Sequence, residues 1–219
     1  MNPSEKGNGI YVYCLIKSTG EKKNFGNIGF GGREVYTVDY KDFAPVISIA
    51  PLRKYDIEEE DIGVHQSVVG HVMNEHSVIP VAYGMVFKNK KIVFAAISAG
   101  YKAIKQAMKK VDNKIELGIK IVQPKDAPEW NGKTDELKLD FLESLKRVAA
   151  FSKERKLFSK RLLWNASFLV EREKIDAFSS AVEQLENKYD CLKIQYSGPW
   201  PPYNFVDVNI LSRRRGGFR

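Results

Sequence analysis

The histidines are the side chains of this sequence best suited to metal binding or acid–base chemistry. They are His65, His71 and His76. Neighbouring members are six and five residues apart, so no two have the i, i+4 spacing with which one helix face holds a zinc ion. No serine, cysteine or carboxylate around them forms a recognisable nucleophile–base arrangement. We therefore expect no catalytic residue and no metal site.

Neither the cysteines nor the glycine-rich stretch predicts a cofactor. Cys14 and Cys191 lie in strand-like runs among hydrophobic residues and form no C-x-x-C pair, so we expect two reduced, buried thiols. Residues 25–32 are rich in glycine but lack the Gly-Lys-Ser/Thr ending of a P-loop and precede a strand rather than a helix. We expect no phosphate site there and no bound cofactor.

The composition is that of a soluble globular protein with a basic surface. The 219 residues are 43% hydrophobic and 28% charged, with a formal net charge of +8. That length fits one large domain or two of about 100 residues each. No apolar run approaches the ~18 residues of a membrane span, and residues 1–8 show no secretory h-region. We expect a cytoplasmic protein whose charge favours acidic partners.

The first half of the chain is predicted to have the order β-β-β-α-β-α. Strand patterns cover residues 9–16, 34–39, 43–50 and 78–87, and helical patterns run from the acidic residues 58–61 to before Pro80 and over 91–111. The strand at 9–16 is apolar on both faces and should lie at the centre of a sheet. Pro80 and Gly84 predict a bend within the last strand.

The second half is predicted to have the order β-α-β-α-β-β. After a strand at 115–122 and a linker at 124–132, an amphipathic helix starts at Thr134 and carries a basic C-terminal end with Lys153 and Arg155. A strand at 162–170 and a helix at 172–189 follow.

A rigid proline corner, S-G-P-W-P-P-Y-N-F-V at residues 197–206, separates the last two predicted strands. Prolines lack backbone donors, so the corner should lie at a sheet end or edge. Trp200 would cover apolar surface there, either as a structural plug or, with Tyr203 and Phe205, as a contact surface for a partner.

The fold class that follows is α+β, with two domains of ferredoxin-like layering whose largely antiparallel sheets carry helices on one face. The domains should span residues 1–112 and 113–211, and residues 212–219 should form a basic flexible tail.

Nucleic-acid binding is the alternative that the charge suggests. Ferredoxin-like sheets with surface aromatics bind RNA, and Lys102, Lys105 and Lys109 line one predicted helix face. However, residues 29–36 depart from the RNP1 pattern at two places: Ile28 replaces the basic residue before the first glycine, and Gly32 replaces a stacking aromatic. A solvated lysine face is the simpler interpretation, and we do not favour nucleic acid as a partner.

Four blocks of sequence resemble the gas vesicle protein F/L family, GvpF and GvpL. The most specific is the octapeptide G-P-W-P-P-Y-N-F at residues 198–205, and the others are residues 9–15, 65–87 and 166–170. The blocks follow the order of the family and span most of the chain.

The resemblance implies two modified ferredoxin-like domains and a non-enzymatic role as an accessory or minor structural protein of gas vesicles. It also implies binding to the hydrophobic shell subunit GvpA and to other accessory Gvp proteins during assembly, in the cytoplasm and in association with the vesicle. The contact residues that we predict are Trp200, Tyr203 and Phe205, with Lys102, Lys105 and Lys109 steering the encounter.

Overall fold

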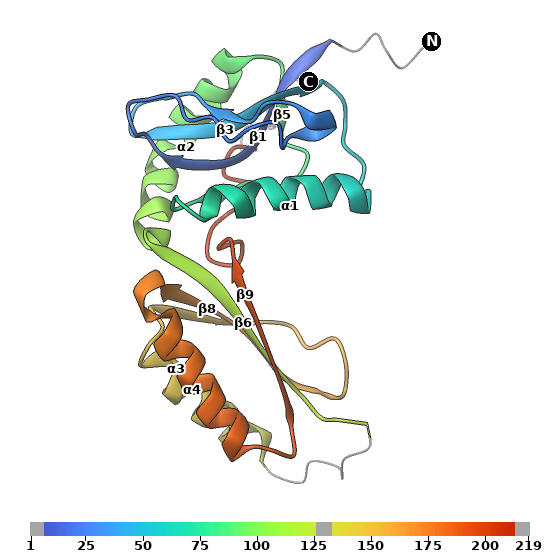
Figure 1. The fold of residues 1–219 in the computed structure, drawn as a ribbon, viewed down its shortest axis with the longest axis vertical. Coiled ribbons are helices and arrows are strands. Elements are labelled where there is room, and N and C mark those ends of the chain that lie inside the picture. Colours follow the sequence, from blue (N-terminus) through green and yellow to red (C-terminus); the bar gives the residue numbers. More distant parts are fainter. Residues whose placement is uncertain (1–6, 126–132, 213–219) are drawn as a thin grey trace. The chain divides into compact units, whose positions relative to one another are not determined.

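The computed structural model describes residues 7–125 and 133–212, which form two compact units. The first unit contains residues 7–112 together with 206–212, and the second contains residues 113–205 with their gap at 126–132. Both combine helices with antiparallel sheet, which confirms the predicted α+β class (Figure 1). Apart from Ser212, the predicted basic tail lies outside the described residues.

The first unit is built on a five-stranded sheet with the order β2-β3-β1-β4, in which β5 also pairs with β1. Its elements are β1 (Asn8–Lys17), η2 (Phe30–Gly32), β2 (Tyr36–Thr37), β3 (Phe43–Pro51), α1 (Glu59–Met73), β4 (Ile79–Pro80), β5 (Val86–Phe87) and α2 (Lys90–Val111).

Strand β1 is the centre of this sheet, as its double-sided apolar pattern predicts. All side chains from Ile10 to Ile16 are buried. Two tyrosine hydroxyls of β1 find partners inside the core: Tyr11 pairs with Nδ1 of His65 on α1 at 3.0 Å, and Tyr13 pairs with Oγ of Ser48 on β3 at 2.9 Å. Helix α1 therefore packs on the tyrosine face of β1, while α2 packs against β1, β4 and β5.

The helix starts follow from local chemistry. Glu59, Glu60 and Asp61 occupy the first turn of α1, where their negative charge complements the helix dipole. At the start of α2, Oδ1 of Asn89 accepts a hydrogen bond from the backbone N–H of Ile92 at 3.1 Å, which is the bond of an N-cap. Neither helix, nor any other in the described part of the chain, has the length and apolarity needed to cross a bilayer.

The predicted strand at 78–87 is bent, as Pro80 and Gly84 indicate. It is divided into the short strands β4 and β5, and Gly84 between them has a φ of +80°, which glycine adopts without steric cost. Within this bend the backbone N–H of Ala82 donates to the carbonyl of Val208 at 2.8 Å. The C-terminal segment therefore covers this part of the sheet edge.

This covering changes the predicted division of the chain. We expected residues 113–211 to form the second domain, but the residues beyond Phe205 belong to the first unit. Ile210 and Leu211 are buried. The residues beyond Phe205 thus give the open strand edge a hydrogen-bond partner and cover it with apolar side chains.

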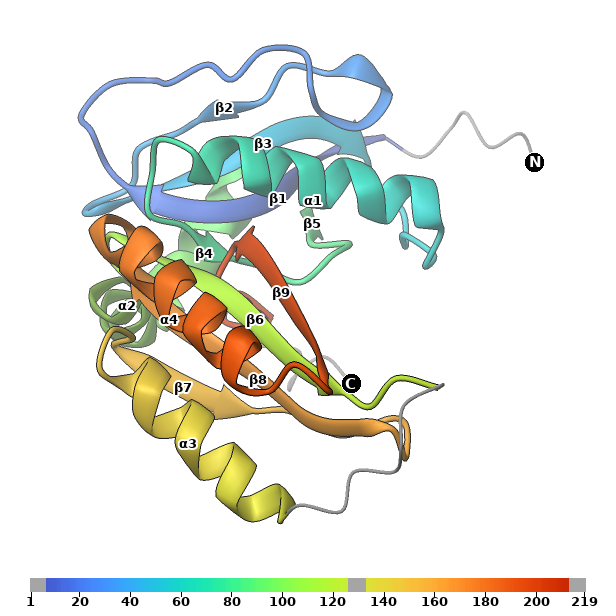
Figure 2. The same ribbon diagram turned by 60° about the horizontal axis from the view of Figure 1, so that its bottom comes forward.

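The second unit has the ferredoxin-like order of elements. Its elements are β6 (Lys114–Val122), α3 (Thr134–Lys146), β7 (Phe151–Glu154), β8 (Leu162–Glu171), η3 (Arg172–Lys174), α4 (Ile175–Lys188) and β9 (Lys193–Trp200). The strands lie in the order β7-β8-β6-β9, and all neighbours are antiparallel (Figure 2). The buried side chains of α3 and α4, such as Phe141 and Phe178, supply the core beside the sheet.

Two predictions about the second unit were wrong. Helix α3 ends at Lys146, and the basic residues assigned to its end lie in or after the short strand β7. No strand follows the proline corner among residues 201–212, which form turns instead. The N–H of Tyr203 donates to the carbonyl of Pro201 at 2.7 Å, and that of Phe205 to the carbonyl of Pro202 at 3.1 Å, so these local bonds replace a ladder.

The prediction that both cysteines are buried was also wrong. Cys14 is buried in β1, but Cys191 is exposed in the turn between α4 and β9. Leu192, which follows Cys191, is the buried residue of this turn. Both thiols are free.

Candidate partner-binding site

The proline octapeptide, residues 198–205, is anchored to the second sheet by Asn204. The backbone N–H of Asn204 donates to Oε2 of Glu116 at 2.9 Å, and its side-chain amide donates to Oε1 of the same carboxylate. The amide also donates to Oγ of Ser167 at 3.2 Å. Both carboxylate oxygens of Glu116 thus hold one residue of the octapeptide in place.

Glu116 is the residue of this site that the sequence did not reveal. It lies in β6, at a position where alternation predicts a solvent-facing side chain, yet only 4% of it is exposed. A buried carboxylate requires hydrogen bonds to replace its lost hydration, and Asn204 donates two. The only signal in the sequence was a lone acidic residue within an apolar strand.

Two cations complete the anchor. Nζ of Lys153 donates to the backbone carbonyl of Asn204 at 3.1 Å, and Nη1 of Arg155 donates to Oδ1 of its side chain. Lys153 lies opposite Ser167 in the β7–β8 ladder, which brings both residues to the same face of the sheet. Lys153 and Arg155 thus donate to the two oxygen atoms of Asn204, whereas Glu116 and Ser167 accept from its N–H groups.

The three aromatic residues predicted to contact a partner differ in exposure. Phe205 is buried, Tyr203 is half-buried, and Trp200 is 53% exposed. Of the three, Phe205 is the one whose side chain is buried, as that of a structural plug would be. Trp200 is left as a large apolar side chain on a backbone that hydrogen bonds hold in place.

Gly198 allows the octapeptide to approach the sheet. Its φ is +125°, and a Cβ added there would lie 2.9 Å from Cδ2 of Leu117 and 3.0 Å from the carbonyl oxygen of Glu116. A side chain at this position would push the turn away from β6.

Strand β9, which leads into the octapeptide, is at the edge of the second sheet. Its residues from Gln195 to Trp200 are all exposed. At the opposite edge, β7 is short and charged, which discourages pairing with another strand. The exposed tryptophan therefore lies at the end of the less protected edge.

The three lysines predicted to steer a partner belong to the first unit, not to the unit that contains the octapeptide. Lys102, Lys105 and Lys109 are all exposed on α2. Lys105 lies 3.6 Å from a carboxylate oxygen of Asp42, so part of its charge is compensated locally.

The histidines do not form a chemical centre. His65 is buried beside Tyr11, and desolvation lowers its pKa to about 4. His71 and His76 both lie against the ring of Phe25. Among residues 7–125 and 133–212, no three histidine, cysteine or acidic side chains gather as metal ligands would. The arrangement around Asn204 holds a surface in place and offers no nucleophile with an adjacent base.

Comparison with known proteins identifies relatives along nearly the whole chain. A family model described as gas vesicle synthesis protein GvpL/GvpF matches residues 9–138 and 126–207. Gas vesicle protein F1 of Halobacterium salinarum is 33% identical over 96% of this chain and 98% of its own length. Gas vesicle protein F of Haloferax mediterranei is 32% identical over 95% and 98%, respectively.

Solved structures show the same fold. The crystal structure of GvpF from Anabaena sp. PCC7120 has a TM-score of 0.78 at 20% identity and covers 92% of this chain and 99% of its own. That of GvpF from Microcystis aeruginosa has a TM-score of 0.75 at 19% identity, with 91% and 99% covered.

Proposed function

Because this chain belongs to the GvpL/GvpF family of gas vesicle synthesis proteins, we propose that it acts in gas vesicle assembly as a non-enzymatic accessory or minor structural protein. In this role it binds the small hydrophobic shell subunit GvpA, together with other accessory Gvp proteins, before the shell closes. The contact surface is the exposed side of the octapeptide around Trp200.

The exposure of Trp200 is the observation that carries this proposal. Tryptophan is among the residues that contribute most to binding at interfaces, and burying the exposed part of one is worth roughly 2 kcal/mol. The anchor through Asn204 and Glu116 fixes the turn before any partner arrives. Little conformational entropy is then lost on binding, which favours affinity.

A hydrophobic shell subunit also needs such a partner on physical grounds. Its apolar surface aggregates unless something occupies it before assembly. The exposed β9 edge next to Trp200 offers both backbone groups and an apolar side chain for that purpose. The lysine face of α2 increases the rate of encounter with acidic partners.

Capture of purified GvpA by the immobilised full chain tests the proposal. We expect Trp200→Ala to weaken capture by about 10- to 100-fold while the melting temperature stays within a few degrees of the parent. The matched control is Leu139→Ala, which removes a 55% exposed apolar side chain from α3 in the same unit and should leave capture unchanged. Equal capture by both variants would remove the octapeptide surface from the proposal.

An RNA titration over a range of salt concentrations examines the alternative. A nucleic-acid-binding module would bind RNA with a steep salt dependence and with sequence preference. That result, combined with absence of GvpA capture, would replace shell-subunit binding by nucleic-acid binding. We expect GvpA capture and only weak RNA binding that does not depend on sequence.

A further inference from the structure

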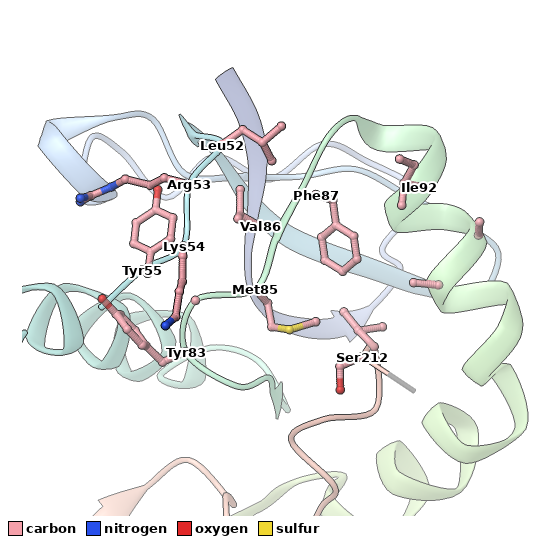
Figure 3. A pocket seen from close by; sticks show the side chains of 14 residues that line it. Leu52, Arg53, Lys54, Tyr55, Tyr83, Met85, Val86, Phe87, Ile92 and Ser212 are labelled. Atoms are coloured by element: carbon pink, nitrogen blue, oxygen red, sulfur yellow. The ribbon is translucent and has the colours of Figure 1, made fainter. Parts of the chain in front are cut away.

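An open groove of about 940 Å³ surrounds strand β5 in the first unit (Figure 3). The strand lies in the middle of the groove, with Tyr55 and Tyr83 on one side and Ile92 of α2 on the other. Met85, Val86 and Phe87 form its centre. The free edge of a β-strand is thus the feature around which the groove is built.

The pairing register shows which backbone groups of β5 face the groove. Val86 lies opposite Tyr11 of β1, and Phe87 lies opposite Ile10. The N–H of Val12 donates to the carbonyl of Met85 at 2.9 Å, so these two residues form a hydrogen-bonded pair of the ladder. The next pair, Tyr11 and Val86, is therefore a non-hydrogen-bonded pair. In an antiparallel ladder the next residue directs its N–H and C=O away from its partner strand. Both backbone groups of Val86 therefore point to the open side of the edge.

The two sides of the groove differ in chemistry. On the side of α2, the lining is apolar and includes Phe87 and Ile92. On the other side, Arg53 and Lys54 stand beside the tyrosines, and they are the charged members of the lining. Arg53 already lies 3.5 Å from a carboxylate oxygen of Asp61, whereas Lys54 extends into the groove in Figure 3. An occupant should thus be apolar towards α2 and acidic towards Lys54.

The same sheet edge already accepts one peptide segment. In the returning C-terminal segment, the carbonyl of Val208 accepts a hydrogen bond from the N–H of Ala82 at 2.8 Å. The later residues Leu211 and Ser212 of this segment also line the groove. The bend between β4 and β5 is covered in this way. Among residues 7–125 and 133–212, no segment pairs with the outer edge of β5.

We propose that the edge of β5 binds an extended segment of a partner protein by strand addition. The segment pairs through its backbone with Val86 and alternates apolar side chains, which contact Phe87 and Ile92, with Asp or Glu side chains, which face Lys54. This site belongs to the first unit and does not depend on the role of Trp200. It would give the chain a second, independent binding surface.

A fluorescently labelled eight-residue peptide of alternating Val and Glu, added to the full-length chain, tests this site by anisotropy. The control peptide has Lys in place of Glu, and a third has its central backbone amides N-methylated. We expect the Glu peptide to bind at least tenfold more tightly than either. The amide of Val86 should also exchange its hydrogen more slowly when the Glu peptide is bound.

Protein variants separate backbone pairing from adsorption to an apolar surface. Val86→Pro removes the outward N–H, and proline is tolerated at the edge of a sheet. This change should weaken binding about tenfold beyond the effect of Val86→Ala. Lys54→Glu should reverse the preference between the Glu and Lys peptides. The melting temperatures of Val86→Ala, Val86→Pro and Lys54→Glu report whether the fold of each variant is intact.

Four results would overturn the proposal, three from peptide binding and one from self-association. The first three are no binding of the Glu peptide at about 1 mM, equal affinities of Val86→Ala and Val86→Pro, or a peptide preference that Lys54→Glu leaves unchanged. Self-association of the free chain that Val86→Pro abolishes would assign the edge to a second copy and would also contradict it.

Discussion

Asn204 binds Glu116 through both its backbone and its side chain. The backbone N–H donates to Oε2 at 2.9 Å, the side-chain amide donates to Oε1, and Glu116 as a residue is only 4% exposed. This pair turns a proline-rich segment into a fixed surface. A buried charge with fewer donors is costly, so the pair should be strongly coupled in stability.

We predict that the energetic effects of Asn204→Ala and Glu116→Gln on folding are not additive. Asn204→Ala leaves the buried carboxylate with fewer donors and should lower the free energy of unfolding by about 2–3 kcal/mol. In a chain that already carries Glu116→Gln, the same change should cost about 1 kcal/mol less, because no buried charge is left unpaired. Urea unfolding of the four proteins measures this cycle. Additive effects would show that the two residues are not coupled.

Acid should destabilise the first unit through His65. Burial beside Tyr11 lowers its pKa from 6.5 to about 4, so between these pH values the unfolded chain binds a proton that the folded chain does not. Stability should therefore fall as the pH drops from about 6.5 to about 4, by up to about 3 kcal/mol from this group.

Unfolding free energies measured across this pH range check the effect. Relative to the parent chain, His65→Gln should show a shallower loss of stability, whereas His71→Gln, which changes an exposed histidine, should retain the full slope. The same slope in all three proteins would rule out His65 as the titrating group.

Gly198→Ala should destabilise the second unit. The φ of +125° is strained for alanine, and the added Cβ would meet Leu117 at 2.9 Å. We expect a loss of about 2 kcal/mol in unfolding free energy and a displaced octapeptide. Gly63→Ala is the matched control, since Gly63 lies in α1 with open space around it and alanine favours a helix. Thermal unfolding that ranks Gly198→Ala as the more stable variant would contradict this account.

The sequence predicts the elements that a strong local pattern defines. Strand β1 is apolar on both faces and lies at the sheet centre, and the acidic run at Glu59 marks the start of α1. The pattern fails where the chain is short or polar. Strand β7 contains Phe151, Ser152, Lys153 and Glu154, so it has neither alternation nor β-branched residues and only its ladder with β8 defines it.

The candidate site was predictable only in its location. Proline spacing indicates a rigid corner at residues 198–205, but it gives no information on distant partners. Glu116 is 88 positions away from Asn204, and no local pattern links them. The same limit applies to Val208, whose carbonyl accepts the N–H of Ala82 and so returns the chain to the first unit. Such pairings are tertiary, and a single sequence does not display them.

Site-specific photocrosslinking tests the central claim most directly. A photoreactive phenylalanine derivative replaces Trp200 in one full-length chain and Leu139 in another, and each is irradiated in the presence of purified GvpA. We predict a covalent adduct with GvpA from position 200 and none from position 139. An excess of the unmodified chain should compete for GvpA and lower the yield of the adduct. Absence of an adduct at position 200, or equal yields at both positions, would contradict the claim that the octapeptide surface holds the shell subunit.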